Sequence, residues 1–92
     1  MAESLRLDKW LWFARFFKTR GLAQKAIENG LVTVGGRAVG KVAQAVRVGD
    51  VVCFPAGRRF RQVQVVALGG RRGPAAEAQG LYADDVFVEP PL

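Results

Sequence analysis

The apolar residues in the first thirty positions recur at helical spacing in two short stretches. Residues 5–18 contain no glycine or proline, and Leu7, Trp10, Leu11, Ala14 and Phe17 fall on one side of a 3.6-residue wheel, with Phe13 and Phe16 on the adjacent side. Ser4 is a suitable cap for this first helix, and Thr19 interrupts the pattern and is a suitable cap for a second helix over residues 20–29. Gly30 ends the second helix. Two helices joined by so short a turn predict a helix–turn–helix.

From Leu31 onward the apolar positions alternate with polar ones, which is the period of a β-strand. Gly35-Gly36 is a two-residue hairpin signal between two such segments. Further glycine-containing turns separate the later segments. The predicted strand segments are residues 32–34, 37–39, 46–48, 51–54 and 59–68. Together they predict a small, mostly antiparallel sheet.

The last third of the sequence predicts one more helix. Pro74 fits the first position of a helix over residues 75–84, with Leu81 and Tyr82 as its docking residues. We therefore expect one α+β domain over residues 1–83, in which an N-terminal two-helix element packs on the sheet and a short C-terminal helix follows. Residues 84–92 are expected to form a short, acidic, flexible tail.

Charge is distributed unevenly between these two parts. The whole chain has a net charge of +6, but residues 84–92 carry three acids and no base. Residues 1–83 therefore carry 14 bases against 5 acids, and arginine outnumbers lysine ten to four. Arginine binds phosphate bidentately and stacks on bases, which lysine does not. A folded basic body of this kind indicates a polyanionic partner, most often a nucleic acid.

The composition argues against catalysis and against metal binding. The chain has no histidine, which is the commonest general base and the commonest metal ligand. Its one cysteine, Cys53, lies in a valine-rich strand, where we expect a small buried hydrophobe rather than a nucleophile. A single cysteine forms no internal disulfide, and no signal peptide or apolar run of 18 residues is present. We expect a cytoplasmic protein without cofactor, metal or membrane contact.

The basic residues of the two helices are the strongest candidate site. Arg6 and Lys9 lie one helical turn apart, Arg15 and Lys18 repeat that spacing, and Lys25 lies on the second helix. A solvated helix face is the usual fate of such a charge run. Binding is favoured here because few acids neutralise the run. Asp8 is the main exception, and we expect it to favour the helix start or to hold Arg15 or another base.

Five aromatic residues crowd the first helix, more than one apolar stripe can bury. We expect Trp10 and Phe17 in the core. The other three either stack on bases or are covered by the C-terminal segment, and the second interpretation is favoured because an exposed aromatic flank promotes association. These three are Trp12, Phe13 and Phe16.

A further basic cluster lies later in the chain. It comprises Arg58, Arg59 and Arg61, with Arg71 and Arg72 beyond. Two interpretations stay open for it: an extension of the RNA footprint, or a solvated outer face of the sheet.

Several of these residues together resemble the S4-type RNA-binding domain. The matching string is Arg6-Leu7-Asp8-Lys9-Trp10-Leu11, followed by Thr19-Arg20 and the Val48-Gly49-Asp50 turn. Asp8-Lys9-Trp10-Leu11-Trp12, Lys18-Thr19-Arg20 and the late Arg71-Arg72-Gly73-Pro74 narrow the resemblance to the ribosome-associated heat-shock protein 15 family, over residues 5–83.

This resemblance implies a partner and a set of contacts. It implies non-enzymatic binding to large ribosomal subunits, notably free ones that still hold a nascent chain, in recycling or rescue, with the nascent chain or a transfer RNA as further candidate contacts. We expect the protein to act as a monomer. The RNA contacts implied by the family pattern are Arg6, Lys9, Arg15, Lys18, Thr19, Arg20, Lys25 and Lys41.

The sequence departs from the family pattern at two places. Gly40-Lys41-Val42 stands where the family often has a Lys-Pro pair, so we expect a more mobile loop there. The C-terminus is acidic and apolar where relatives often carry a basic extension.

Two other classes of function stay open. One is a helix–turn–helix DNA-binding regulator, for which the second helix offers mainly Gln24 and Lys25 as base-reading groups. The other is an RNA-modifying or aminoacylating enzyme carrying this module, which the short length argues against.

Overall fold

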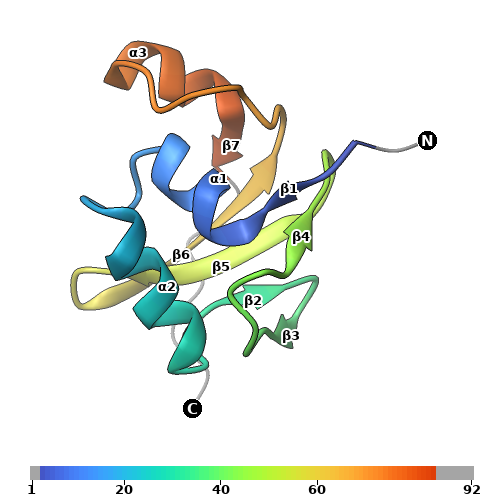
Figure 1. Ribbon diagram of the computed structural model, residues 1–92, viewed down its shortest axis with the longest axis vertical. Coiled ribbons are helices and arrows are strands. Elements are labelled where there is room, and N and C mark those ends of the chain that lie inside the picture. The colour runs from blue at the N-terminus through green and yellow to red at the C-terminus, as the bar shows by residue number, and fades with distance from the viewer. Residues whose placement is uncertain (1–2, 85–92) are drawn as a thin grey trace.

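A computed structural model describes residues 3–84 of the chain, and its two longest helices lie side by side over a sheet (Figure 1). The helices are α1 (Leu7–Phe13) and α2 (Arg20–Glu28). A short helix, α3 (Ala75–Ala78), and a 3₁₀ turn, η1 (Gln79–Leu81), follow the sheet. The predicted α+β class and the helix–turn–helix are confirmed. The predicted acidic tail, apart from Asp84, lies outside the described residues.

The sheet has five antiparallel strands in the order β3-β2-β5-β6-β7. Its strands are β2 (Thr33–Val34), β3 (Arg37–Ala38), β5 (Val51–Ala56), β6 (Arg59–Val65) and β7 (Tyr82–Asp84). A separate two-stranded pair joins β1 (Leu5–Arg6) to β4 (Ala45–Val46). The two glycines of the hairpin turn between β2 and β3 have φ values of 60° and 83°, which explains why glycine occupies both positions.

The first helix is shorter than the predicted range of residues 5–18. Leu5 and Arg6 pair with β4, so the helix begins only at Leu7. Arg6 occupies the cap position without a side-chain hydrogen bond, and the prediction that Ser4 caps this helix is wrong. The cause is the strand pairing, because the Leu7 N–H is already taken by the Gln44 carbonyl at 2.7 Å.

The end of α1 is fixed by a left-handed residue that is not glycine. Arg15 has φ 65°, and its N–H donates to the Trp12 carbonyl at 3.1 Å. The next N–H, of Phe16, donates to the Leu11 carbonyl at 3.1 Å. These two bonds form a Schellman motif, and the ring of Phe16 packs 5.9 Å from that of Trp10, as the motif's apolar contact requires.

The C-terminal segment also departs from the prediction of one helix over residues 75–84. After one turn of helix the chain tightens into η1 and then joins the sheet as β7, antiparallel to β6. The Leu81 carbonyl accepts the N–H groups of Val66 and Ala67 at 2.9 and 3.2 Å. These bonds to the two residues after β6, together with the β6–β7 pairing, draw residues 82–84 out of helical conformation, which local propensity could not reveal.

The core lies between the helix pair and the sheet. Trp10 is fully buried, and its indole N–H donates to the Ala67 carbonyl at 3.0 Å. The other largest fully buried apolar side chains are Leu7, Leu11, Ile27, Val32, Val46, Val52, Phe54, Val63 and Val65.

Two expectations about the core were wrong. Phe17 is only partly buried, at 6.2 Å from the Phe54 ring, because α1 has already ended. Cys53 is also only partly buried, because strand alternation directs its neighbours Val52 and Phe54 inward.

The C-terminal segment covers the aromatic flank, as the favoured interpretation predicted. The ring of Phe16 lies 4.5 Å from that of Tyr82, and the Arg72 guanidinium lies 5.6 Å from the Trp12 ring centre. Arg72 also donates to the Trp12 carbonyl at 3.2 Å. The third ring of the flank, Phe13, is buried. Base stacking by these side chains is therefore not favoured.

The cap of α2 gives a direct test of this local structure. The Thr19 hydroxyl oxygen accepts the Leu22 N–H at 3.1 Å, as predicted. Thr19→Ala should lower the free energy of unfolding by about 1 kcal/mol. Thermal unfolding followed by circular dichroism should show a fall in Tm of about 4–8 °C. Thr19→Ser keeps the acceptor and should retain most of the stability. Equal losses in the two variants would contradict the capping role.

Candidate nucleic-acid interface

The carboxylate of Asp8 joins the two helices. Its side chain is fully buried, on the first turn of α1. Arg6 donates to both carboxylate oxygens, at 3.1 and 3.2 Å. From α2, Arg20 and Gln24 donate to one of these oxygens at 3.0 and 2.9 Å. The expectation that Asp8 holds a base is confirmed, and the bases are Arg6 and Arg20 rather than Arg15.

These contacts determine the ionisation of Asp8. Burial alone would raise the pKa of its carboxyl, because it removes water from the charged form. Hydrogen bonds from Gln24, Arg6 and Arg20 act in the opposite direction and outweigh it. The pKa is therefore lowered below its ordinary value of 3.8, and Asp8 is a carboxylate at neutral pH.

Asp8 orients the two arginines and leaves some of their N–H donors free. A guanidinium carries five N–H donors. Arg20 uses one of them on Asp8 and Arg6 uses two, and their side chains remain 34% and 43% exposed. Both therefore keep donors for an external anion while the buried carboxylate restricts their rotamers.

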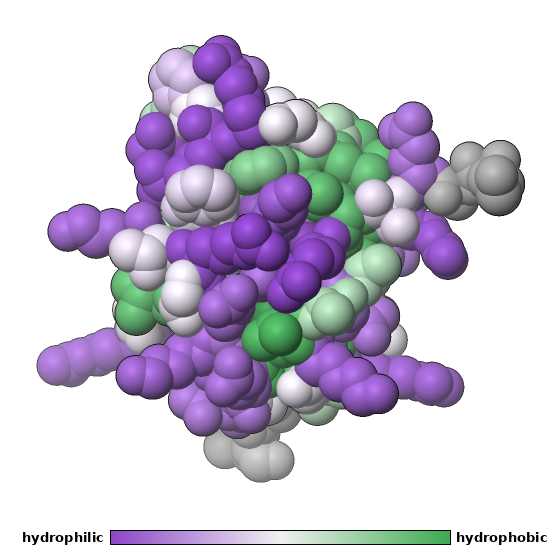
Figure 2. Space-filling view, in the orientation of Figure 1, coloured by the Kyte–Doolittle hydropathy of each residue, from purple (hydrophilic) through white to green (hydrophobic). Residues whose placement is uncertain are grey.

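The two helices and the turn between them also carry three lysines. Lys9 on α1, Lys18 in the turn and Lys25 on α2 have no acidic group within salt-bridge distance among residues 3–84. We call the surface formed by Arg6, Lys9, Lys18, Arg20 and Lys25 the basic helix face. Figure 2 shows hydrophilic side chains gathered over the two helices, with smaller apolar patches between them.

Two other predicted contacts have structural roles. The Arg15 guanidinium donates to the Gly73 carbonyl at 2.6 Å, which ties the end of α1 to the segment before α3. The Thr19 hydroxyl is engaged as the cap of α2. Five of the eight predicted residues thus lie on the two helices or on the strand and turn that adjoin them, and Arg15 and Thr19 are engaged within the protein.

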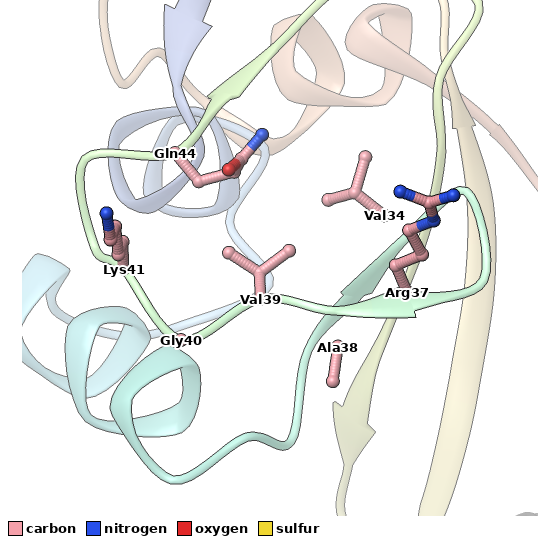
Figure 3. A pocket seen from close by; sticks show the side chains of 7 residues that line it. All are labelled: Val34, Arg37, Ala38, Val39, Gly40, Lys41 and Gln44. Carbon is pink, nitrogen blue, oxygen red and sulfur yellow. The ribbon is translucent and has the colours of Figure 1, made fainter.

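The eighth predicted residue, Lys41, lies by a pocket below the helix pair. The pocket has a volume of about 470 Å³ and lies between the β2–β3 hairpin and the loop that follows (Figure 3). It is lined by Val34, Arg37, Ala38, Val39, Gly40, Lys41 and Gln44. Sequence reasoning missed Arg37 and Gln44. The hairpin signal placed Arg37 beside the turn, but nothing local pointed to a pocket.

Three of the later arginines, Arg61, Arg71 and Arg72, have partners among residues 3–84. Arg61 lies 5.1 Å from the ring centres of both Phe16 and Tyr82 and bonds to Asp84 at 2.7 Å, so it has a packing role. Arg71 pairs with Glu77 at 2.9 Å. Arg58 and Arg59 are exposed at the β5–β6 turn.

Two observations on the described residues concern metal binding and thiol chemistry. Within residues 3–84, no three acidic, cysteine or histidine side chains gather where they could hold a metal ion. Burial raises the pKa of the Cys53 thiol, which disfavours the reactive thiolate. No helix in this part of the chain has the length and apolarity to cross a membrane.

Comparison with known proteins places this architecture in a family. The S4 domain model matches residues 5–52, which include both helices and the pocket, and the chain belongs to the S4 domain family. Among its relatives, a heat shock protein 15 homolog of Haemophilus influenzae is 42% identical over 85 residues, covering 91% of this chain and 64% of that protein. The Escherichia coli heat shock protein 15 is 42% identical over 83 residues. The chain thus spans just under two thirds of the length of these relatives.

Two further matches extend the comparison. The RQC P-site tRNA stabilizing factor of Halalkalibacterium halodurans is 36% identical over 61 residues, covering 66% of this chain and 68% of that protein. A trimeric structure of Vibrio cholerae heat shock protein 15 superposes with a TM-score of 0.85 at 37% identity, covering 90% of this chain and 83% of that one. The predicted resemblance to S4-type, heat-shock-protein-15-like chains is confirmed.

The role of Asp8 predicts a pH-dependent contribution to stability. At pH 7, Asp8→Asn should lower the free energy of unfolding by about 2 kcal/mol, because it replaces charge-assisted hydrogen bonds in a buried site. The folded-state pKa lies below 3.8, so this contribution is complete above that pH and is lost as the pH falls through the folded value. Urea unfolding at a series of pH values should show the difference from wild type narrowing toward pH 3.

A charge-matched variant controls for the lost negative charge. Asp50→Asn makes the same change at the turn before β5, where Asp50 accepts the Arg47 N–H at 2.9 Å. An amide oxygen can replace that acceptor, so we expect a small effect. A difference between wild type and Asp8→Asn that stays constant down to pH 3 would contradict the role assigned to the carboxylate.

Proposed function

We propose that this protein binds structured ribosomal RNA through the basic helix face, without catalysing a reaction. The observation that carries the proposal is the arrangement around Asp8: two arginines held in fixed orientation, flanked by lysines with no acidic partner among the described residues. Phosphate contacts of this kind orient a protein on a nucleic acid, and their charge supplies most of the affinity.

The partner we propose is the large ribosomal subunit, in the recycling or rescue of subunits that carry a nascent chain. Membership of the S4 domain family and the identity to heat shock protein 15 support this assignment. The name of the H. halodurans relative attributes to that protein the stabilisation of a P-site transfer RNA, which makes a transfer RNA a further candidate contact.

RNA is favoured over DNA by the state of the second helix. A helix that reads the major groove of DNA needs free base-reading side chains. The amide nitrogen of Gln24 is bonded to Asp8, and the basic groups that the helix presents are Arg20 and Lys25, which suit phosphates. The deep groove of an RNA duplex excludes side chains, so a protein recognises the duplex by its shape and its phosphates. The basic helix face carries the cations that phosphate contacts require.

Removal of two unpaired lysines tests the proposal. Lys9→Ala combined with Lys18→Ala should weaken binding to 23S ribosomal RNA fragments and to purified large subunits by about ten-fold at low salt. The slope of log affinity against log salt should fall by about two, one for each lost phosphate contact. Filter binding over a range of salt concentrations measures both quantities.

The matched control removes two positive charges elsewhere. Arg47 lies in the loop between β4 and β5, and Arg71 lies in the segment before α3, where it pairs with Glu77. Arg47→Ala combined with Arg71→Ala should retain nearly wild-type affinity. If both double variants lost the same RNA affinity, the effect would be one of general charge and would contradict the assigned face. Tighter binding of the wild type to duplex DNA than to RNA would also contradict the proposal.

We also propose that the chain acts as a monomer. The V. cholerae relative is described as trimeric, so sedimentation of this chain alone and with RNA discriminates the two states.

A further inference from the structure

The pocket beside the hairpin differs in character from the basic helix face. Its centre is apolar, since Val39 is buried and Val34 packs against the core. Its margin is polar and carries two cations, Arg37 and Lys41, with the amide of Gln44. Figure 3 shows Arg37 and Gln44 on opposite sides of Val39. An apolar centre with a few polar groups around it is the usual composition of a small-ligand site.

The charge of the pocket indicates an anionic ligand. Arg37 and Lys41 are both exposed, and neither has an acidic partner among residues 3–84. No carboxylate lines the pocket. The Gln44 amide can both donate and accept, so it suits the edge of a base better than a simple ion.

Backbone bonds join one wall of the pocket to the start of α1. The Gln44 carbonyl accepts the Leu7 N–H at 2.7 Å, which fixes this loop against the start of α1. The next residue, Ala45, pairs with Arg6 in the small β1–β4 ladder. A nucleic-acid strand lying along the helices therefore passes close to the mouth of the pocket.

The volume of the pocket limits which part of a nucleic acid can enter it. A volume of about 470 Å³ admits a single nucleotide but not the width of a duplex. Unpaired bases in RNA are read on their edges and stack on aromatic rings or guanidinium planes. No aromatic side chain lines this pocket, so the Arg37 guanidinium and the face of Val39 would supply that contact.

We propose that this pocket receives one unpaired nucleotide of the RNA bound by the basic helix face, a step that rests on the function proposed above. The base lies against Val39, Gln44 contacts its edge, and Lys41 with Arg37 neutralises the adjoining phosphate. The pocket thereby directs the protein to an irregularity in a helix, which the phosphate contacts alone do not distinguish.

A pair of RNA hairpins tests this proposal. The two share one stem sequence, and one of them carries a single bulged adenosine. The wild-type protein should bind the bulged hairpin about five-fold or more tightly than the regular one, as expected for stacking of one base. Fluorescence anisotropy with end-labelled hairpins measures both affinities.

Two glycine variants separate the pocket from general charge effects. A Cβ at Gly40 or Gly70 meets no atom within 4 Å, and neither residue has a positive φ that would strain a side chain. Gly40→Leu adds an isobutyl group at the pocket wall and should abolish the preference while keeping the affinity for the regular hairpin. Gly70→Leu adds the same group outside the pocket and should retain the preference. Circular dichroism confirms that each variant folds.

A second variant keeps the test decisive if Gly40→Leu does not fold. Gln44→Ala removes the amide but keeps the backbone bond to α1, and it should reduce the preference by about three-fold. Equal binding of both hairpins by the wild type would overturn the pocket proposal and leave RNA binding intact. Binding of neither hairpin would overturn the proposed function as well. A preference that survives both Gly40→Leu and Gln44→Ala, or that Gly70→Leu also removes, would overturn the assignment to this pocket.

Discussion

A buried carboxylate on the first turn of α1 joins the two helices that carry the basic helix face. Asp8 accepts hydrogen bonds from one residue before its own helix and from two residues of the next helix. An unpaired charge in such a position would be strongly unfavourable, so the two helices must keep the registration in which these donors reach it. The orientation of Arg6 and Arg20 is thus a consequence of how the protein satisfies a buried charge.

Contacts between residues distant in sequence stabilise the fold around Asp8. The left-handed Arg15, which ends α1, donates to the Gly73 carbonyl, and Arg72 donates back to the Trp12 carbonyl. These two arginines fasten the turn between the helices to the segment before α3. The positive φ of Arg15 costs about 1 kcal/mol relative to glycine, and its hydrogen bond offsets that cost. The same segment then supplies Tyr82, which covers the Phe16 ring.

This division between local and distant contacts explains what the sequence could predict. The start of α2 and the hairpin follow from local chemistry, the Thr19 cap and the paired glycines, and both were predicted. The start of α1 and the conversion of residues 82–84 from predicted helix to strand depend on partners more than a dozen residues away.

The candidate site follows the same rule. The basic residues are visible in the sequence, but their availability is not. Only tertiary contacts determine whether a given cation is bound to Asp8, lacks an acidic partner among the described residues or serves packing. Gln24, a neutral residue with no distinguishing pattern around it, completes the shell of the carboxylate. The pocket depends on the placement of Gln44 against α1, which no local signal predicts.

The pairing of Arg6 and Arg20 with an acid has a consequence for the proposed binding. Asp8 cancels one positive charge of the pair, which weakens the long-range attraction to phosphate. In return it restrains two side chains that each carry about 2 kcal/mol of rotamer entropy, so less of that entropy is lost when RNA binds. The lysines, which have no acidic partner among residues 3–84, keep their full charge and lack this restraint. On this account the lysines supply the salt-dependent attraction, the arginines fix the position of the backbone, and the pocket beside them is the part of the surface able to distinguish one RNA from another.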